Sequence, residues 1–217
     1  MNGEGLFADA ARNLGKSART RARLMDAAVR IFARVGYEAA SVNEIAQAAD
    51  VANGTFYLHF RSKDEIAGAV AFAVAADVAR RLDDAMADVD DAIERTSFAT
   101  RQFLEFAAGA PEWGWAMFRA VWYMPELRKQ VVTYLRADLE RGRAQGVFKV
   151  EIDDFLVDTF GSMVVGALFG RLRGETGPEA GSKLAELQLR MLGVAPARAH
   201  RAAWKPIVPL KLDSARS

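Results

Sequence analysis

A short segment of the chain, residues 52–59, carries side chain types that can bind DNA. An Asn amide can bond the edge of an adenine, and the methyl groups of Thr and Ala can contact a thymine methyl. Tyr and His can donate hydrogen bonds to phosphates, which fixes register without reading sequence. Glycine and alanine let a helix start approach the bases closely. The candidate residues are Ala52, Asn53, Gly54, Thr55, Tyr57 and His59.

Two short helices are predicted to position these side chains. Residues 41–49 open with Ser41-Val42-Asn43-Glu44, a capping box, and residues 53–59 follow after a three- or four-residue turn. This pattern is typical of a helix-turn-helix, whose second helix lies in the major groove of DNA. We also expect Ser41 and Asn43 to face the DNA, and Lys63 to form an anion site with free amides at the next helix start.

A longer helix is predicted upstream, from about Ser17 or Thr20 to Val35, with Gly36 as its C-cap. Residues 12–37 contain seven basic residues and one acid, Asp26. Such a stripe is the electrostatic footprint of phosphate binding, although a charge run is also typical of a solvated helix face. Arg19 and Arg21 lie near the helix start and are expected to reach phosphates or the minor groove.

The run from Ser41 to Glu65 resembles the signature of the tetracycline-repressor (TetR) family of bacterial regulators. The shared features are an Ile-Ala pair, an apolar turn, Gly-Thr-aromatic-Tyr, a His-Phe pair and then Ser-Lys-acid. The resemblance covers roughly residues 18–66. The turn Asp50-Val51-Ala52 departs from the Gly-Val-Ser of many members and lacks the usual Ser hydroxyl. Asn53 is then a candidate cap, which would remove it from base reading and favour Thr55 and Tyr57.

The resemblance implies an all-α homodimer with an N-terminal three-helix DNA-binding domain and a C-terminal ligand-binding and dimerisation domain. Prolines are absent from the first 110 residues and no sustained alternation typical of strands occurs, so the residues also favour an all-α chain of about nine helices. The expected parts are a flexible arm at 1–16, the helix-turn-helix domain at 17–62, the ligand-binding domain at 63–195 with a linking helix at 63–82, and an extended or disordered tail at 196–217.

Aromatic and Met side chains cluster in the middle of the chain. Apolar, aromatic-lined cavities bind small molecules, and Met adapts to irregular shapes, although an ordinary helical core has the same composition. A polar contact could come from Arg101, Glu105, Arg119 or Asp158, and nothing in the sequence selects one. The candidate pocket residues are Phe98, Phe103, Phe106, Trp113, Met117, Phe118, Trp122, Tyr123, Phe160 and Met163.

Small residues recur along the predicted helix at 153–173, where Gly161, Gly166 and Gly170 allow close helix approach. Each glycine costs about 1 kcal/mol against Ala in a helix interior, so three of them indicate a packing reason. The family resemblance implies that the last two long helices form the dimer interface, and packing within one chain is the alternative. The candidate interface residues are Phe155, Gly166, Phe169, Gly170, Leu184, Leu187 and Met191.

Composition excludes several other functions. The 217 residues carry a net charge of +1, no Cys and two His, so thiolate and polyhistidine metal sites are not expected. The longest uncharged runs have 11 and 12 residues, against about 18 for a spanning helix, and the N-terminus does not resemble a signal peptide. We therefore expect a cytoplasmic protein. No nucleophile–base–acid set is visible, so we expect no enzyme, cofactor or metal.

The resemblance implies a ligand-responsive repressor. A homodimer would bind a pseudo-palindromic double-stranded operator, and a small, mainly apolar or aromatic effector would release it. An activator or architectural DNA-binding protein without an effector is the alternative, and a helical enzyme is a remote one.

Overall fold

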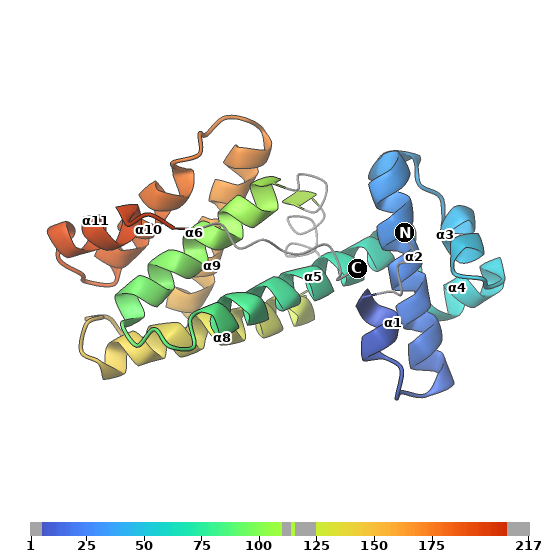
Figure 1. The fold of residues 1–217 in the computed structure, drawn as a ribbon, viewed down its shortest axis with the longest axis horizontal. Helices are drawn as coiled ribbons and strands as arrows, with labels where there is room; N and C mark the ends of the chain where they lie inside the picture. The colour runs from blue at the N-terminus through green and yellow to red at the C-terminus, as the bar shows by residue number, and fades with distance from the viewer. Residues whose placement is uncertain (1–5, 110–113, 116–124, 208–217) are drawn as a thin grey trace. The chain divides into compact units, whose positions relative to one another are not determined.

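The computed structural model describes residues 6–109, 114–115 and 125–207. These residues form ten helices and no strand, which confirms the all-α prediction. They divide into two compact units, with the boundary after Ala73, inside the long helix α5 (Lys63–Ala85). Figure 1 shows the helices in chain order.

The first unit contains α1 (Leu6–Ala10), α2 (Lys16–Ala39), α3 (Val42–Ala48), α4 (Asn53–His59) and the start of α5. Gly36 interrupts α2 with φ 78°, a left-handed conformation that glycine adopts without strain, so the predicted helix stop is confirmed. The Ser41–Glu44 capping box at the start of α3 is also confirmed. At the start of α5, Ser62 Oγ accepts from the Glu65 amide, and the Glu65 carboxylate accepts from the Arg61 amide.

The predicted flexible arm contains a helix, α1, that is held by the one acid of the basic stripe. Both carboxylate oxygens of the buried Asp26 accept hydrogen bonds, one from the Phe7 amide at 3.0 Å and one from the Ala8 amide at 2.9 Å. Asp26 therefore satisfies free donors at the start of α1. Burial raises the pKa of its carboxyl above the ordinary 3.8, although the two amide hydrogen bonds and the charge of Arg30 lower it.

The second unit contains the rest of α5 and α6 (Ala92–Gly109), α8 (Pro125–Ala144), α9 (Asp154–Leu172), α10 (Ala180–Met191) and α11 (Pro196–Trp204). Helix α6 contacts α8, α9, α10 and α11, so it lies at the centre of this unit (Figure 1). The core includes Leu139 of α8, Phe160 of α9 and Leu189 of α10, all at most 1% exposed. Gly142 of α8 lies directly under the ring of Phe148, so only a residue without a Cβ fits there.

Helix α11 falls where an extended or disordered tail was predicted, and that prediction is wrong for residues 196–204. Pro196 occupies the first turn of the helix, where a missing N–H costs nothing. Ala199 and Ala203 are fully buried, and α11 packs on α6 and α10. Arg101 of α6 also donates a hydrogen bond to the carbonyl of Lys205 at 2.7 Å. The prolines therefore begin and end this helix without interrupting it.

Helix α9 is long and apolar enough to cross a membrane by length and composition alone, which the uncharged runs in the sequence did not indicate. One side of it packs against α6, α8 and α10 within the unit. Other residues along it are exposed, including Phe155 at 78%. A core helix and a helix buried in an interface have the same composition, so this property does not identify a membrane span.

Candidate DNA-binding helix and ligand cavity

Helix α4 is anchored by two buried phenylalanines and presents its other residues to solvent. Phe56 and Phe60 are 0% and 1% exposed, and their ring centroids lie 5.8 Å apart. Tyr57 is 57% exposed, so its hydroxyl is free to meet a phosphate. Leu58, which the sequence analysis did not single out, is 82% exposed on the same helix. The other predicted contacts on the helix and its N-cap are exposed or half-buried: Ala52, Asn53, Gly54, Thr55 and His59.

The turn before α4 differs from the expected arrangement at its cap. Ala52 is the N-cap residue, and no side chain accepts a hydrogen bond there, so the predicted capping by Asn53 is wrong. Asn53 lies in the first turn of the helix and is exposed. Earlier in the turn, Asp50 has φ 54°. Asp tolerates this left-handed conformation better than most residues, which explains how this chain replaces the usual glycine.

Lys63 is engaged within the first unit. Its ammonium donates three hydrogen bonds to main-chain carbonyls at the end of α2, those of Tyr37 at 2.8 Å, Glu38 at 3.2 Å and Ala40 at 2.9 Å. The same nitrogen lies 4.5 Å from the centroid of the Tyr37 ring. An ammonium has three donors, so a phosphate contact through Lys63 Nζ would require breaking one of these bonds.

The basic residues of α2 fall into two groups. Arg30 donates to the carbonyl of Ala48 at 3.1 Å, and Arg34 lies 3.9 Å from Glu44, so both support α3. Arg21 is exposed, with its guanidinium 4.7 Å from the centroid of the Phe60 ring. Nearer the start of the helix, Lys16, Arg19 and Arg23 are exposed, and no ion pair is seen for them within the described part of the chain.

The start of α3 supplies the remaining predicted DNA contacts. Ser41 Oγ accepts from the Glu44 amide at 3.2 Å and donates to the Glu44 carboxylate at 2.7 Å, so its hydroxyl already has a structural role. Asn43 is exposed in the first turn. The hydrogen bonds that Ser41 donates to the Glu44 carboxylate lower the pKa of that carboxyl below its ordinary value. Asn43 is therefore better placed than Ser41 to contact another molecule.

The second unit contains a cavity of about 420 Å³ between four helices. This volume lies within the range of about 300–1,000 Å³ that small-molecule sites occupy. Most of the lining is aliphatic or aromatic. Its described residues are Ala79, Leu82 and Asp83 of α5, Met86 just after α5, Thr96, Ala99, Thr100 and Phe103 of α6, Val132, Tyr134, Leu135 and Asp138 of α8, and Phe160, Gly161, Ser162, Val164, Val165, Gly166 and Phe169 of α9.

The cavity lining includes Asp138, the acid of a buried ion pair. Arg95 of α6 is 3% exposed and donates to the Asp138 carboxylate at 2.6 Å, to the carbonyl of Met86 at 2.5 Å and to the Asp83 carboxylate. Burial raises the pKa of the Asp138 carboxyl, and Arg95 opposes this shift. The side chain of Asp138 is 12% exposed and that of Asp83 is 47% exposed. Arg95 therefore fixes the position of a desolvated carboxylate at the cavity wall.

Two threonines of α6, one turn apart, also line the cavity. Thr100 Oγ1 donates to the amide oxygen of the fully buried Gln188 at 2.8 Å, and Gln188 Nε2 donates to the carbonyl of Phe160. Thr96 is 4% exposed, and its hydroxyl has no hydrogen-bond partner within the described residues. A buried hydroxyl without a partner is uncommon and requires an explanation.

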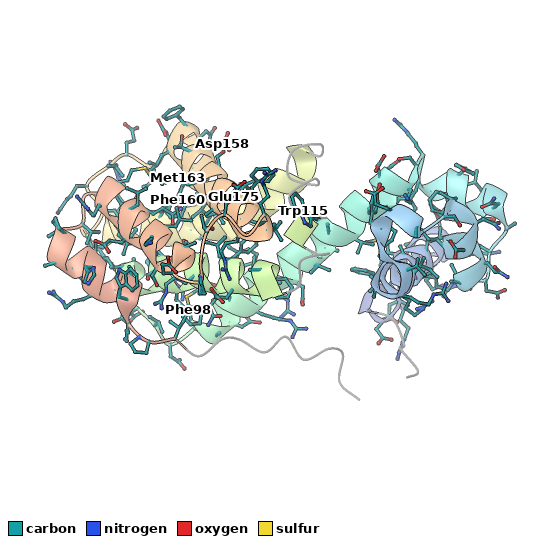
Figure 2. The ribbon with its side chains drawn as sticks, turned by 90° about the horizontal axis from the view of Figure 1, so that it is seen from above. Phe98, Trp115, Asp158, Phe160, Met163 and Glu175 are labelled. Atoms are coloured by element: carbon teal, nitrogen blue, oxygen red, sulfur yellow. The ribbon has the colours of Figure 1, made fainter. Side chains whose placement is uncertain are left out.

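The predicted pocket residues separate into three groups. Phe103 and Phe160 line the cavity. Phe98, Phe106 and Met163 do not appear in its described lining, and Met163 of α9 instead packs near Leu104 and Leu168. Figure 2 labels Phe98, Phe160 and Met163. The others lie outside the described residues: Trp113, Met117, Phe118, Trp122 and Tyr123.

The polar residues that the sequence suggested for the pocket do not appear in the described lining of the cavity. The sequence suggested Arg101, Glu105, Arg119 or Asp158. Arg119 lies outside the described residues, and the other three are absent from the described lining. Asp158, labelled in Figure 2, is exposed on α9. The lining has Asp138 and Thr96 instead. Their presence in one lining depends on how α6 and α8 pack, and no motif in the sequence signals it.

The residues predicted for a dimer interface have different environments within one chain. Phe155 and Leu187 are 78% and 56% exposed, while Leu184 is 8% exposed and packs with Leu104 and Leu168. Phe169 lines the cavity, and its ring centroid lies 5.9 Å from that of Trp115. Gly166 is exposed, Gly170 is buried against Thr176, and Met191 packs partly on the core.

The glycines of α9 do not all serve close helix packing. A Cβ added at Gly161 or Gly166 would meet no atom within 4 Å, and both residues line the cavity. Gly170 is different, because its Cβ would lie 3.2 Å from Thr176. Two of the three glycines therefore leave open space within the chain.

Residues 24–70 match the family model described as "Bacterial regulatory proteins, tetR family". This segment contains most of α2, all of α3 and α4, and the start of α5. This segment of the chain is a TetR-type DNA-binding domain. The matched segment includes Phe56 and Phe60, the two buried residues that anchor α4, and the capping box at Ser41.

Curated bacterial regulators match the chain over short segments. The chain is 46% identical over 44 residues to the fatty acid metabolism regulator protein of Bacillus subtilis (strain 168), which is 20% of this chain and 23% of that protein. It is 40% identical over 47 residues to the HTH-type transcriptional regulator AcrR of Shigella flexneri, 22% of each chain. The matched segments thus span less than a quarter of these relatives.

Solved structures resemble the chain over most of its length. The crystal structure of RolR in complex with resorcinol aligns with a TM-score of 0.78 and 26% identity, covering 89% of this chain and 97% of RolR. FadR from Bacillus subtilis in complex with stearoyl-CoA aligns with a TM-score of 0.60 and 19% identity, covering 80% and 97%. The second likeness shows a shared fold alone.

Proposed function

We propose that this protein is a ligand-responsive transcriptional regulator that binds a pseudo-palindromic operator as a homodimer and is released by a small, mainly apolar effector. The observation that carries the proposal is the TetR-type helix-turn-helix at residues 24–70, joined in one chain to a unit with an apolar cavity of about 420 Å³. We favour repression over activation, because an effector that releases a repressor from DNA would switch the regulated genes on.

The exposed side of α4 is the proposed recognition surface. Two buried rings, Phe56 and Phe60, fix the helix on its unit, so its outer residues are presented by a rigid element. Thr55 and Asn53 would meet base edges in the major groove, and Tyr57 would bind a phosphate. The unpaired cations at the start of α2, among them Arg19, would add phosphate contacts whose strength falls with salt.

The proposed homodimer is supported by exposed apolar side chains on the last long helices. Phe155 of α9 and Leu187 of α10 are large and mostly exposed in one chain. Burying such residues removes apolar surface from water, which favours association. For a helix-turn-helix dimer, the two recognition helices would then meet half-sites about 34–36 Å apart or a multiple of this.

The effector would act by favouring one arrangement of the dimer over another. It can shift this equilibrium only by the difference in its affinity for the two states, typically about 1–3 kcal/mol. The likeness to RolR bound to resorcinol supports a small aromatic effector. The absence of a nucleophile–base–acid set in the sequence weighs against an enzyme. We expect a cytoplasmic protein that needs no cofactor.

The test is selection of binding sites from a random duplex DNA library at two salt concentrations. The intact chain should enrich a palindrome, and Thr55→Ala should weaken or change that preference. Tyr57→Phe should weaken binding to every sequence by a similar factor and leave the preferred site unchanged. Glu151→Gln, at an exposed residue of the second unit outside the cavity lining, is the control.

Enrichment of no sequence, with binding that vanishes at higher salt, would contradict operator recognition and leave phosphate attraction alone. A change of preferred site in Tyr57→Phe would refute the phosphate role of that hydroxyl. Enrichment of one unpaired half-site would contradict the dimer while keeping the DNA-binding role.

A further inference from the structure

The lining of the cavity includes two polar groups whose hydrogen bonding is incomplete. The hydroxyl of Thr96 has no partner within the described residues although it is buried. One carboxylate oxygen of Asp138 accepts from Arg95, and the described part of the chain shows no hydrogen bond to the other. Leaving a buried polar group unsatisfied is unfavourable, so a molecule that completes both sites would gain from filling them.

The charges around Asp138 favour a neutral ligand. Arg95 and Asp138 are both desolvated and pair with each other, so the buried charge is balanced. Asp83, the other acid on Arg95, is half-exposed, so solvent screens its charge. An anionic ligand would meet the Asp138 carboxylate, and a cationic ligand would have to lose its hydration beside Arg95. Both are costly in a mainly apolar cavity.

Size and lining favour an aromatic molecule of one or two rings. The lining also includes Phe103, Phe160 and Phe169 with several aliphatic residues. Aromatic rings pack against one another in tilted or offset arrangements, which adds to the gain from burial. Gly161 and Gly166 have no atom within 4 Å of an added Cβ, so the α9 wall leaves room for a flat ring.

We propose that the cavity binds a neutral hydroxylated aromatic molecule, one hydroxyl of which donates a hydrogen bond to the free carboxylate oxygen of Asp138, with the Thr96 hydroxyl as the second polar contact. A hydroxyl suits both groups, because it donates to a carboxylate and can accept from another hydroxyl. The inference rests on the proposed function, in which this cavity is the effector site, and it names the chemical class and the two residues that select it.

The experiment measures binding to the full chain by isothermal titration calorimetry. Phenol, resorcinol and 1-naphthol are each compared with the fully methylated ether, which has a similar shape and no hydroxyl donor. Each hydroxylated compound should bind roughly tenfold tighter or more than its ether, as expected for a hydrogen bond to a charged group. Benzoate and benzylammonium test the charge argument and should bind more weakly than phenol.

Three variants locate the contact. Asp138→Asn keeps an oxygen for Arg95 but replaces the free acceptor with a donor, so it should abolish the preference for hydroxyls. Thr96→Val removes a hydroxyl that has no partner, so it should fold normally, weaken the hydroxylated compounds several-fold and leave the ethers unchanged. Glu140→Gln, on the exposed side of the same helix as Asp138, is the matched control and should change nothing.

The outcomes separate this inference from the proposed function. Equal binding of compounds and ethers, or tighter binding of benzoate or benzylammonium, would overturn the hydroxyl inference while leaving the cavity as an effector site. Retained hydroxyl preference in both Asp138→Asn and Thr96→Val would overturn the assigned residues. Failure of every compound and every ether to bind would overturn the inference together with the effector part of the proposed function, while operator selection tests the DNA-binding part independently.

Discussion

Thr96 and Thr100 are expected to respond in opposite ways to replacement by valine, although they lie one turn apart on α6 and both line the cavity. Thr100 Oγ1 donates at 2.8 Å to the amide oxygen of Gln188, a residue that is 0% exposed. Thr100→Val leaves that oxygen buried without this donor, which costs about 1–3 kcal/mol. Since valine and threonine have similar shape and helix propensity, the lost hydrogen bond dominates the change.

Thr96→Val has no hydrogen bond to lose within the described residues. Exchanging an unpartnered buried hydroxyl for a methyl group should leave the free energy of unfolding unchanged or raise it by up to about 1 kcal/mol. The two variants should therefore differ by roughly 1–4 kcal/mol, which corresponds to several degrees in Tm for a chain of this size.

The assay is urea denaturation followed by circular dichroism, at fixed protein concentration and without added ligand, since dimerisation or binding would shift the apparent stability. The double variant Thr100→Val with Gln188→Met removes both partners and should recover part of the loss of Thr100→Val. Unchanged stability in Thr100→Val, or an equal loss in Thr96→Val, would refute the assignment of hydrogen-bond partners on which the cavity argument depends.

Three further changes test other contacts. Lys63→Met removes three hydrogen bonds to carbonyls at the end of α2, so it should lower the free energy of unfolding by about 1–3 kcal/mol and lower Tm. An unchanged Tm with weaker operator binding would instead favour a phosphate contact through Lys63. Burial raises the pKa of Asp26 above its ordinary value of 3.8. The contribution of Asp26 to the free energy of unfolding should therefore fall as the pH rises from its ordinary pKa of 3.8 through the folded-state pKa. The urea midpoint of Asp26→Asn should not show that fall. Gly142→Ala should lower Tm despite the better helix propensity of alanine, because its Cβ would lie 2.1 Å from the ring of Phe148; a higher Tm would show that the ring moves freely.

The DNA-binding region could be predicted closely from sequence because its signals are local. The capping box at Ser41, the helix stop at Gly36 and the bounds of α4 depend on hydrogen bonds between residues a few positions apart. The one prediction that was wrong at the start of α4 also has a local cause. Asn53 does not cap α4, because Ala52 takes the N-cap position and leaves Asn53 one residue inside the helix.

Longer-range contacts corrected several expectations in ways that no local pattern signals. Lys63 lies at a helix start that resembles an anion site, yet its ammonium is bound by carbonyls that lie 23 to 26 residues away along the chain. Asp26 looked like a lone acid in a basic stripe, and it is buried as the anchor of α1. Pro196 starts a helix because the buried faces of Ala199 and Ala203 fit against α6 and α10.

The sequence by itself determined the all-α class and the helix-turn-helix, since periodicity, capping and the family signature are properties of neighbouring positions. Only the tertiary structure decided the composition of the cavity. Its lining includes both Thr96 of α6 and Asp138 of α8, the latter held by Arg95, because helices that are far apart in the chain pack together. Hydrophobic burial is not directional, so an aromatic-rich sequence shows that a core or cavity forms without showing which side chains line it.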